Sequence, residues 1–283
     1  MSRFLESLKN EIEKCGANVF AIAEYYDGKT EQMQIKEANP CQDTYSVSKL
    51  FVVTAVGMLC DRGLLRTDEI ITDILGDDCP KDYEKHWDKI TVDMLLLHKT
   101  SLPGGFLDID CFDANDFGHD YLAYTMKYKT GFHGDEPAPV YTDAAFYLLA
   151  RIVEKRAGVG CDNFLWRNLF YPLGVREAAW SHCPMGHTMG ATGLYIRAED
   201  IAKHGSLYLN GGMWRGKRIL SENWVNTVLE KGYELRPVCG GRAYAKGGMR
   251  GQMCMVIPSQ KRVVSYVGCG GHNFTDFIAD YQD

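Results

Sequence analysis

The sequence predicts an α/β fold with an antiparallel sheet that is built from both chain ends, flanked by helices and interrupted by an inserted, mostly helical region. Near the start, residues 18–26 and 31–36 have strand character on either side of Asp27-Gly28, a strong hairpin signal. Near the end, residues 251–257 and 262–267 are short apolar runs. Between these segments the pattern is mostly helical. We therefore expect the early and late strands to join in one sheet.

Helices are expected at both ends of the chain. Residues 1–14 form a charged amphipathic pattern without an apolar core or a cleavage pattern, which is typical of a surface helix and not of a secretory signal. Residues 272–281 could close the chain as a second helix. We expect residues 1–60 and 210–283 to form the sheet region, residues 61–209 to form the inserted helical region, and both to make a single compact unit.

Composition restricts the class of partner. The 283 residues are 46% hydrophobic and 24% charged, with a net charge of −6. No dense Lys/Arg run favours nucleic acid, and no apolar stretch approaches membrane-spanning length. We expect a cytoplasmic protein that acts on a small-molecule substrate, with neither nucleic acid nor membrane as partner. The oligomeric state stays open.

The cysteines do not form a recognisable metal or redox motif. There are ten, and no two have C-x-x-C spacing. In a reducing compartment this pattern predicts small buried hydrophobic residues and not disulfides or a zinc site. We expect no cofactor and no metal ion.

The most informative motif is Ser46-Val47-Ser48-Lys49, at the opening of an apolar helical run over residues 47–61, with Gly63 as a helix stop. The spacing puts the Ser46 hydroxyl and the Lys49 amine on one helix face, at the positive end of the helix. A lysine desolvated against a buried helix can accept a proton and so activate a serine. The alternative is a chance match, since about one S-x-x-K is expected in a chain of this length.

Two further segments carry candidate site residues. Tyr141-Thr142-Asp143 opens a helical run that ends at Gly158, with Thr142 or Asp143 as the N-cap. The glycines of Lys246-Gly247-Gly248 let a backbone approach another group closely. Taken singly, each segment could be structural: Tyr141 a packing residue, Asp143 a helix cap, and the glycines a strand entry.

Together, in this order and spacing, the three segments resemble the penicillin-recognising serine hydrolases, which include class C β-lactamases, D-Ala-D-Ala peptidases and related esterases. The resemblance implies a β-lactamase/transpeptidase-like fold and a catalytic unit of the S-x-x-K type. It covers most of the chain, in residues 46–68, 90–103, 141–158, 171–175, 193–195 and 211–221.

Carried over residue by residue, the resemblance makes Ser46 the acylated nucleophile and Lys49 the group that accepts its proton. Tyr141 matches the family's general acid/base tyrosine. Lys246 matches the strand lysine that tunes this tyrosine and holds anionic substrates. The backbone N–H groups of Ser46 and Met249 would form an oxyanion hole, which stabilises charge that appears only in the tetrahedral state.

The first departure from the family pattern is Asp143, which replaces the usual Asn of Tyr-x-Asn. An ionised carboxylate only accepts hydrogen bonds, whereas an amide also donates them. Our hypothesis is that Asp143 pairs with Lys49, keeps it protonated and shifts the role of base toward Tyr141. If Asp143→Asn left both the rate and its pH profile unchanged, the hypothesis would be contradicted.

The second departure is Gly247, where β-lactamases and peptidases generally carry a hydroxyl that grips the substrate carboxylate. With Lys246, Gly248 and Asp143, Gly247 is expected to line the substrate site. Its missing hydroxyl weakens the case for efficient penicillin turnover. We expect a β-lactamase-family serine hydrolase that acts through an acyl-enzyme on a small ester, amide or β-lactam, with esterase-like activity favoured.

Other interpretations remain open at this point. Residues 211–218 nearly match a phosphate-binding P-loop, but Arg218 stands where Ser or Thr is required, so we interpret them as a turn. His182, Cys183 and His187 could ligate a metal but lack an obvious fourth ligand. His98 and His272 are interpreted as loop or packing residues. The main alternative function is a non-catalytic scaffold of the same fold that binds a ligand or partner.

Overall fold

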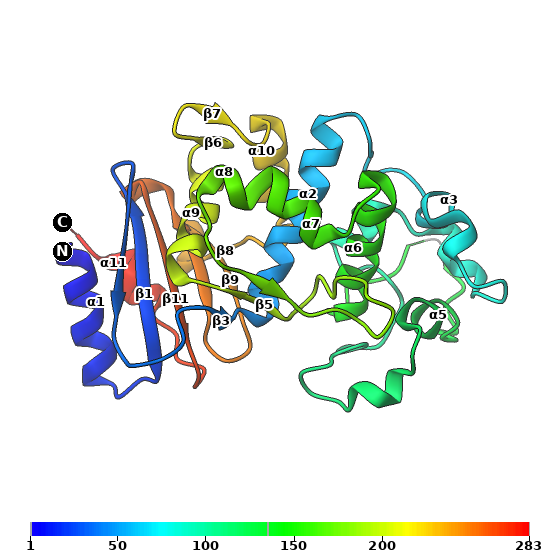
Figure 1. Cartoon of the computed structure of the whole chain (residues 1–283), viewed down its shortest axis with the longest axis horizontal. Helices are drawn as coiled ribbons and strands as arrows, with labels where there is room; N and C mark the ends of the chain where they lie inside the picture. Colours follow the sequence, from blue (N-terminus) through cyan, green and yellow to red (C-terminus); the bar gives the residue numbers. More distant parts are fainter. Residues whose placement is uncertain (1, 135, 283) are drawn as a thin grey trace. The chain divides into compact units, whose positions relative to one another are not determined.

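The central sheet has six antiparallel strands in the order β2-β1-β11-β10-β9-β8 (Figure 1). The computed structural model describes residues 2–134 and 136–282. The early strands β2 and β1 lie at one side of this order and join the late strands through the pairing of β1 with β11, which confirms a sheet built from both chain ends. The strands are β1 (Val19–Tyr26), β2 (Lys29–Gln34), β8 (Arg236–Val238), β9 (Ala243–Gly247), β10 (Met253–Ile257) and β11 (Arg262–Gly268).

A two-residue turn joins β1 and β2 as the sequence predicts. Asp27 and Gly28 both have positive φ, 47° and 75°, which suits the right-handed twist of a hairpin. Because the turn is this short, β2 begins at Lys29 and not at Glu31. At the other end, β10 starts two residues later than expected because residues 248–251 form a turn.

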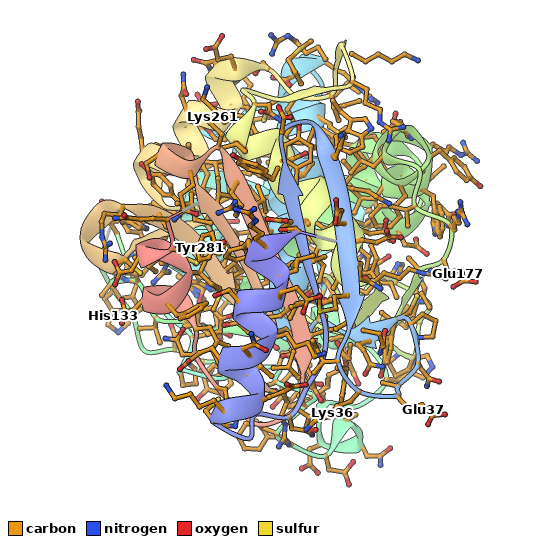
Figure 2. The ribbon with its side chains drawn as sticks, turned by 90° about the vertical axis from the view of Figure 1, so that its left-hand side faces the viewer. Lys36, Glu37, His133, Glu177, Lys261 and Tyr281 are labelled. Carbon is orange, nitrogen blue, oxygen red and sulfur yellow. The ribbon has the colours of Figure 1, made fainter. Side chains whose placement is uncertain are left out.

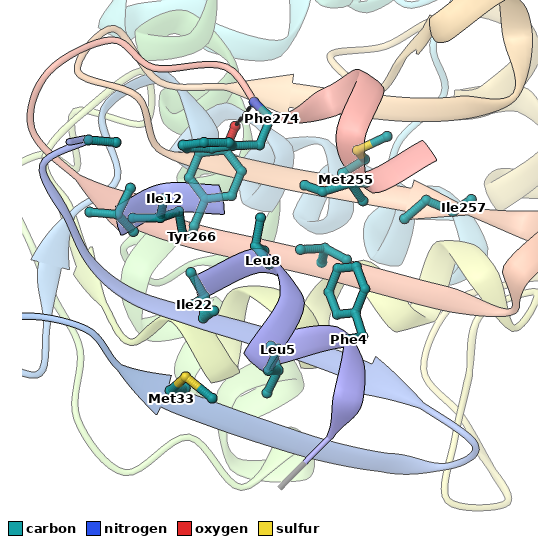
Figure 3. Packing of buried hydrophobic residues seen from close by; sticks show 14 of the residues in the cluster. Phe4, Leu5, Leu8, Ile12, Ile22, Met33, Met255, Ile257, Tyr266 and Phe274 are labelled. Atoms are coloured by element: carbon teal, nitrogen blue, oxygen red, sulfur yellow. Dashed lines mark hydrogen bonds between the residues drawn. The ribbon is translucent and has the colours of Figure 1, made fainter. Parts of the chain in front are cut away.

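Two terminal helices cover one face of the sheet (Figure 2). Helix α1 (Arg3–Lys14) is capped by Ser2, whose hydroxyl accepts from the N–H of Phe4 at 3.1 Å. Helix α11 (Thr275–Asp280) is shorter than the sequence suggests. Alternate strand residues meet these helices in one buried cluster (Figure 3), which includes Phe4, Leu5, Leu8, Ile12, Ile22, Met255, Val264, Tyr266, Phe274 and Ile278.

Helix α9 (Ala198–Leu209) packs on the opposite face of the sheet. A Cβ at Gly205 would lie 2.7 Å from Val263 Cγ1 and 2.9 Å from Cys254 Sγ, so the helix approaches the strands at a distance that only glycine allows. The Ser265 hydroxyl donates to the Ala198 carbonyl at 2.5 Å. Successive side chains of β10 and β11 point to opposite faces of the sheet, and helices cover both faces. This explains why the sequences of these strands are continuously apolar.

His204 on α9 makes stability depend on pH. Its ring stacks on Phe51 at 3.9 Å, and burial lowers the pKa of His204 from 6.5 to about 3. Below pH 6.5 the histidine is therefore protonated in the unfolded chain but stays neutral in the folded chain. The free energy of unfolding falls as pH drops from 6.5 toward 3. Between pH 7 and pH 5, we expect the free energy of unfolding to fall by about 2 kcal/mol less in His204→Gln than in wild type.

Urea unfolding of both chains at these two pH values measures the effect. His119→Gln is the matched control, because His119 is exposed. Equal pH slopes for wild type and His204→Gln would contradict the assignment.

The chain divides into two compact units. Unit 1 comprises residues 1–51, 167–179 and 193–283, and unit 2 comprises residues 52–166 and 180–192. Residues 167–179 and 193–209 therefore lie in unit 1, with the sheet, whereas the sequence-based division placed them in the helical region. Besides the sheet and its helices, unit 1 contains β3 (Gln42–Asp43), β5 (Leu194–Ile196), α8 (Tyr171–Leu173), β6 (Met213–Trp214), β7 (Lys217–Arg218) and α10 (Glu222–Lys231).

Unit 2 is mostly helical. Helix α2 (Ser48–Asp61) begins in unit 1 and ends in unit 2, with Gly63 at φ 67° just beyond it. Helix α6 (Asp143–Ala157) is capped by the Thr142 side chain and stops at Gly158 in the left-handed conformation. The other helices are α3 (Ile71–Leu75), α4 (Val92–Leu96), α5 (Tyr121–Met126) and α7 (Cys161–Leu165); the two-residue strand β4 (Ala179–Trp180) lies at a boundary of the units.

The cysteines correct one prediction. All ten have free thiols, but only Cys161, Cys183 and Cys254 are buried, so the expected burial is wrong for most of them. The others lie in loops or at the ends of elements, where chain packing does not enclose them. Among the described residues, no helix is both long and apolar enough to cross a bilayer.

Candidate active site

The candidate nucleophile, Ser46, lies in a 3-10 turn (Tyr45–Val47) immediately before α2. Tyr45 has φ 46°, a conformation that non-glycine residues rarely adopt, and its N–H donates to Asp43 Oδ1 at 2.8 Å. The side chain of Lys49, one turn further on, is fully buried at 0% exposure. Its Nζ donates to Ser46 Oγ at 3.1 Å, so the amine and the hydroxyl are in direct contact, as the spacing predicts.

The end of β9 lies against this turn. A Cβ at Gly248 would lie 2.6 Å from the carbonyl oxygen of Thr44, two residues before Ser46. A side chain at position 248 would therefore force the backbone of β9 away from Ser46. A Cβ at Gly247 would meet its nearest atom, Met253 Cε, at an ordinary 3.6 Å, so packing does not exclude a hydroxyl residue there.

Met249 lies in the turn between β9 and β10. The Gly248 N–H donates to the Gln252 carbonyl at 2.9 Å, which closes the turn. The buried Gln252 side chain stabilises this turn through two hydrogen bonds. Gln252 Nε2 donates to the Gly268 carbonyl at 2.7 Å, and Gln252 Oε1 accepts from the Arg250 N–H at 3.2 Å. Within residues 2–134 and 136–282, the Met249 N–H has no hydrogen-bond acceptor, as an oxyanion-hole donor requires.

Lys246 has a partner that the sequence analysis missed. Its Nζ forms an ion pair with Glu234, whose side chain is only 1% exposed. Glu234 lies between α10 and β8 with φ 61°, an uncommon conformation for a residue of this size. The pairing of β8 with the neighbouring strand β9 brings Glu234 beside Lys246, and no sequence motif marks that contact. Buried charges are retained when they are paired, so Glu234 fixes the position of the ammonium.

We expect Glu234→Gln to change selectivity between substrates of different charge. The substitution keeps the side chain's shape but removes one negative charge beside Lys246. The ratio of kcat/KM for a carboxylate-bearing ester over a neutral ester should rise several-fold, because the net charge at Lys246 becomes more positive. A loss that is equal for both esters would indicate a purely structural role for Glu234. Glu230→Gln, at an exposed position on α10, is the control.

Tyr141 and Asp143 lie in unit 2. The Tyr141 side chain is 42% exposed and packs on the buried ring of His98, with 4.5 Å between ring centroids. The Thr142 N–H donates to His98 Nδ1 at 3.3 Å, which leaves Nε2 as the protonated nitrogen of the neutral ring. His98 is therefore more than a packing residue: it orients the segment that carries Tyr141. Thr142, and not Asp143, is the N-cap of α6.

Asp143 belongs to an acidic cluster. One carboxylate oxygen each from Asp108, Asp110 and Asp143 lies within 4.8 Å of the other two. The Thr192 hydroxyl donates to Asp110 at 2.5 Å. Such groups also cluster without an ion, and we assign no metal to them.

Two segments that the sequence analysis considered as alternative binding sites, the P-loop-like segment and the histidine cluster, have other structures. Residues 213–218 form the β6–β7 hairpin, which confirms a turn in place of a P-loop. His182 and His187 point to different carboxylates, with His182 Nε2 at 3.3 Å from Asp162 and His187 Nδ1 at 3.0 Å from Glu154. The structure thus gathers Ser46, Lys49 and residues 246–249 in unit 1.

Comparisons with known proteins agree with the family resemblance. The family model described as Beta-lactamase matches residues 21–282. Penicillin-binding protein 4 of Amycolatopsis lactamdurans is 31% identical over 137 residues, which are 47% of this chain and 34% of that protein. The 6-aminohexanoate-dimer hydrolase of Paenarthrobacter ureafaciens is 27% identical over 116 residues, 39% of this chain and 29% of that protein. The matched regions thus span about a third of these relatives.

Solved structures support the fold. The octameric penicillin-binding protein homologue from Pyrococcus abyssi superposes with a TM-score of 0.67 at 18% identity, covering 97% of this chain and 75% of that one. This likeness shows that the two chains share one architecture.

Proposed function

Because the chain belongs to the beta-lactamase family of serine hydrolases, we propose that it cleaves a small ester, amide or β-lactam through an acyl-enzyme on Ser46. The contact between Lys49 Nζ and Ser46 Oγ, 3.1 Å long and made by a fully buried amine, carries this proposal. Few structural roles would require a lysine to be buried against a serine hydroxyl.

In the proposed reaction, Ser46 Oγ attacks the substrate carbonyl carbon and passes its proton to Lys49 or Tyr141. The N–H groups of Ser46 and Met249 stabilise the oxyanion. As the tetrahedral state collapses, the bond to the alcohol or amine breaks, and that leaving group takes up the proton. Water then hydrolyses the acyl-enzyme by the same steps and frees Ser46.

Two observations support an ester or amide over penicillins as the substrate. Gly247 offers no hydroxyl for a substrate carboxylate, although the packing there would tolerate one. Lys246 is already paired with Glu234, which offsets the positive charge that would hold an anion. The name of the Paenarthrobacter relative, a hydrolase of the 6-aminohexanoate dimer, is consistent with amide cleavage in the family.

Intact-protein mass spectrometry after exposure to a fluorophosphonate, a β-lactam and a short-chain p-nitrophenyl ester tests the proposal. We expect one fluorophosphonate adduct in wild type, none in Ser46→Ala, and retained labelling in the control Ser48→Ala, which removes the neighbouring buried hydroxyl. Faster reaction with the ester than with the β-lactam supports the esterase preference. If no probe labels the wild-type protein, the hydrolase proposal fails in favour of a ligand-binding scaffold.

A further inference from the structure

Unit 2 contains an aromatic pocket of about 300 Å³. Five rings and one carboxylate dominate its lining: Phe106, Phe112, Phe117, Tyr124, Tyr128 and Asp116. The volume is at the lower end of the range for small-ligand sites, and a predominantly aromatic lining with few polar groups is typical of them.

The rings support one another. Phe106 and Phe117 are buried, and Phe106 packs on Tyr124 at 5.2 Å and on Tyr128 at 4.8 Å between centroids. Phe112, in contrast, is 57% exposed. Its ring is therefore accessible to a molecule that enters the pocket. The pocket therefore has a packed floor and an open aromatic rim.

Hydrogen bonds tie the pocket wall to the segment that carries Tyr141. The Gly105 N–H donates to the Tyr141 carbonyl at 3.1 Å. The Phe106 carbonyl accepts from the Thr142 hydroxyl at 2.8 Å and from the Asp143 N–H at 3.1 Å. The pocket wall and the Tyr141 segment therefore hold each other in place within unit 2.

The electrostatics of the pocket select for positive charge. Asp116 is the one charged residue among the described residues that line it. Asp108 follows the pocket wall, and its N–H donates to the Gly105 carbonyl at 3.2 Å. Aromatic ring faces carry negative potential and attract organic cations. A carboxylate in this place would be repelled.

We propose that this pocket binds the organic ammonium end of the substrate, so that the protein prefers esters or amides whose acyl part carries a positive charge. The inference rests on the proposed hydrolase function and adds a substrate class to it. Asp116 supplies the charge complement, and the rings supply apolar and cation–π contacts to the methylene or methyl groups around the nitrogen.

Three p-nitrophenyl esters of matched shape test the proposal: 5-(trimethylammonio)pentanoate, its neutral isostere 6,6-dimethylheptanoate, and the monoester of adipate. We expect kcat/KM to fall in this order, with at least about a tenfold advantage of the cation over the neutral ester. Phe112→Leu, which keeps apolar bulk without a ring, and Asp116→Asn should each reduce that advantage several-fold. Asp77→Asn, at an exposed position elsewhere in unit 2, is the control.

The outcomes separate this proposal from the one on which it rests. If no ester is hydrolysed and no probe labels Ser46, the hydrolase function fails. If all three esters react at similar kcat/KM, or if Phe112→Leu and Asp116→Asn slow them equally, the hydrolase function stands and the ammonium pocket is overturned.

Discussion

Lys49→Met is expected to slow acylation of Ser46 by about 10²- to 10⁴-fold, the range typical of removing a proton-transfer group. Methionine has a similar length and fits a buried helix position, so the fold should survive the substitution. What is lost is the amine at 3.1 Å from Ser46 Oγ. The rate of adduct formation with a fluorophosphonate, followed by intact mass, measures this loss independently of any substrate.

The control is Lys217→Met, which alters an exposed lysine on β7. Circular dichroism of both variants establishes that they are folded. An acylation rate in Lys49→Met within threefold of wild type would show that Ser46 does not depend on Lys49 for activation.

The second large effect concerns stability. Arg262→Met is expected to lower the free energy of unfolding by about 3–5 kcal/mol, because it leaves the buried carboxylate of Glu24 without its counter-charge. The two side chains are 1% and 3% exposed, and Arg262 Nε lies 2.9 Å from Glu24 Oε2. The guanidinium also lies over the rings of Phe4 and Tyr26, at 4.5 and 4.4 Å from their centroids. Burial raises the pKa of Glu24 even with Arg262 beside it, so this carboxylate depends on its partner.

Urea unfolding at pH 7 compares Arg262→Met with Arg242→Met. Arg242 pairs with Asp280 at the surface, where an ion pair contributes little, so its substitution should cause no measurable change. The double variant Glu24→Leu/Arg262→Met should recover part of the loss, since it removes both charges at once. A loss below about 1 kcal/mol for Arg262→Met would contradict this prediction and would mean that water enters the site and solvates Glu24.

The sheet could be predicted because its signals are local. Asp27-Gly28 specifies its own turn, and the apolar runs of β10 and β11 identify buried strands without knowledge of their partners. The two-residue strands β3 and β6 could not be found in this way, because a pair of residues shows no periodicity. Strand β3 depends on pairing with the distant strand β5, whereas β6 pairs with its neighbour β7.

The candidate site likewise has features that local sequence predicts and features that depend on tertiary contacts. The Ser46–Lys49 contact follows from helical spacing, and the structure shows it directly. Glu234 and His98 were not predicted as site residues, because what makes them important is the group each one meets: Lys246 for Glu234, and the Tyr141 ring for His98. The aromatic pocket likewise joins residues 103–117 to α5 through side-chain packing that no sequence period encodes.

The strand order has a consequence for synthesis on the ribosome. Strand β1 lies between β2 and β11, so one of its edges is unpaired until residue 268 has left the exit tunnel. Strand β9, which lies against the Ser46 turn, also emerges late. A nascent chain therefore carries its serine and lysine for most of translation without the surroundings that would make them reactive. Long-range pairing of this kind also slows folding and leaves an exposed strand edge, for which chaperones are the cell's usual protection.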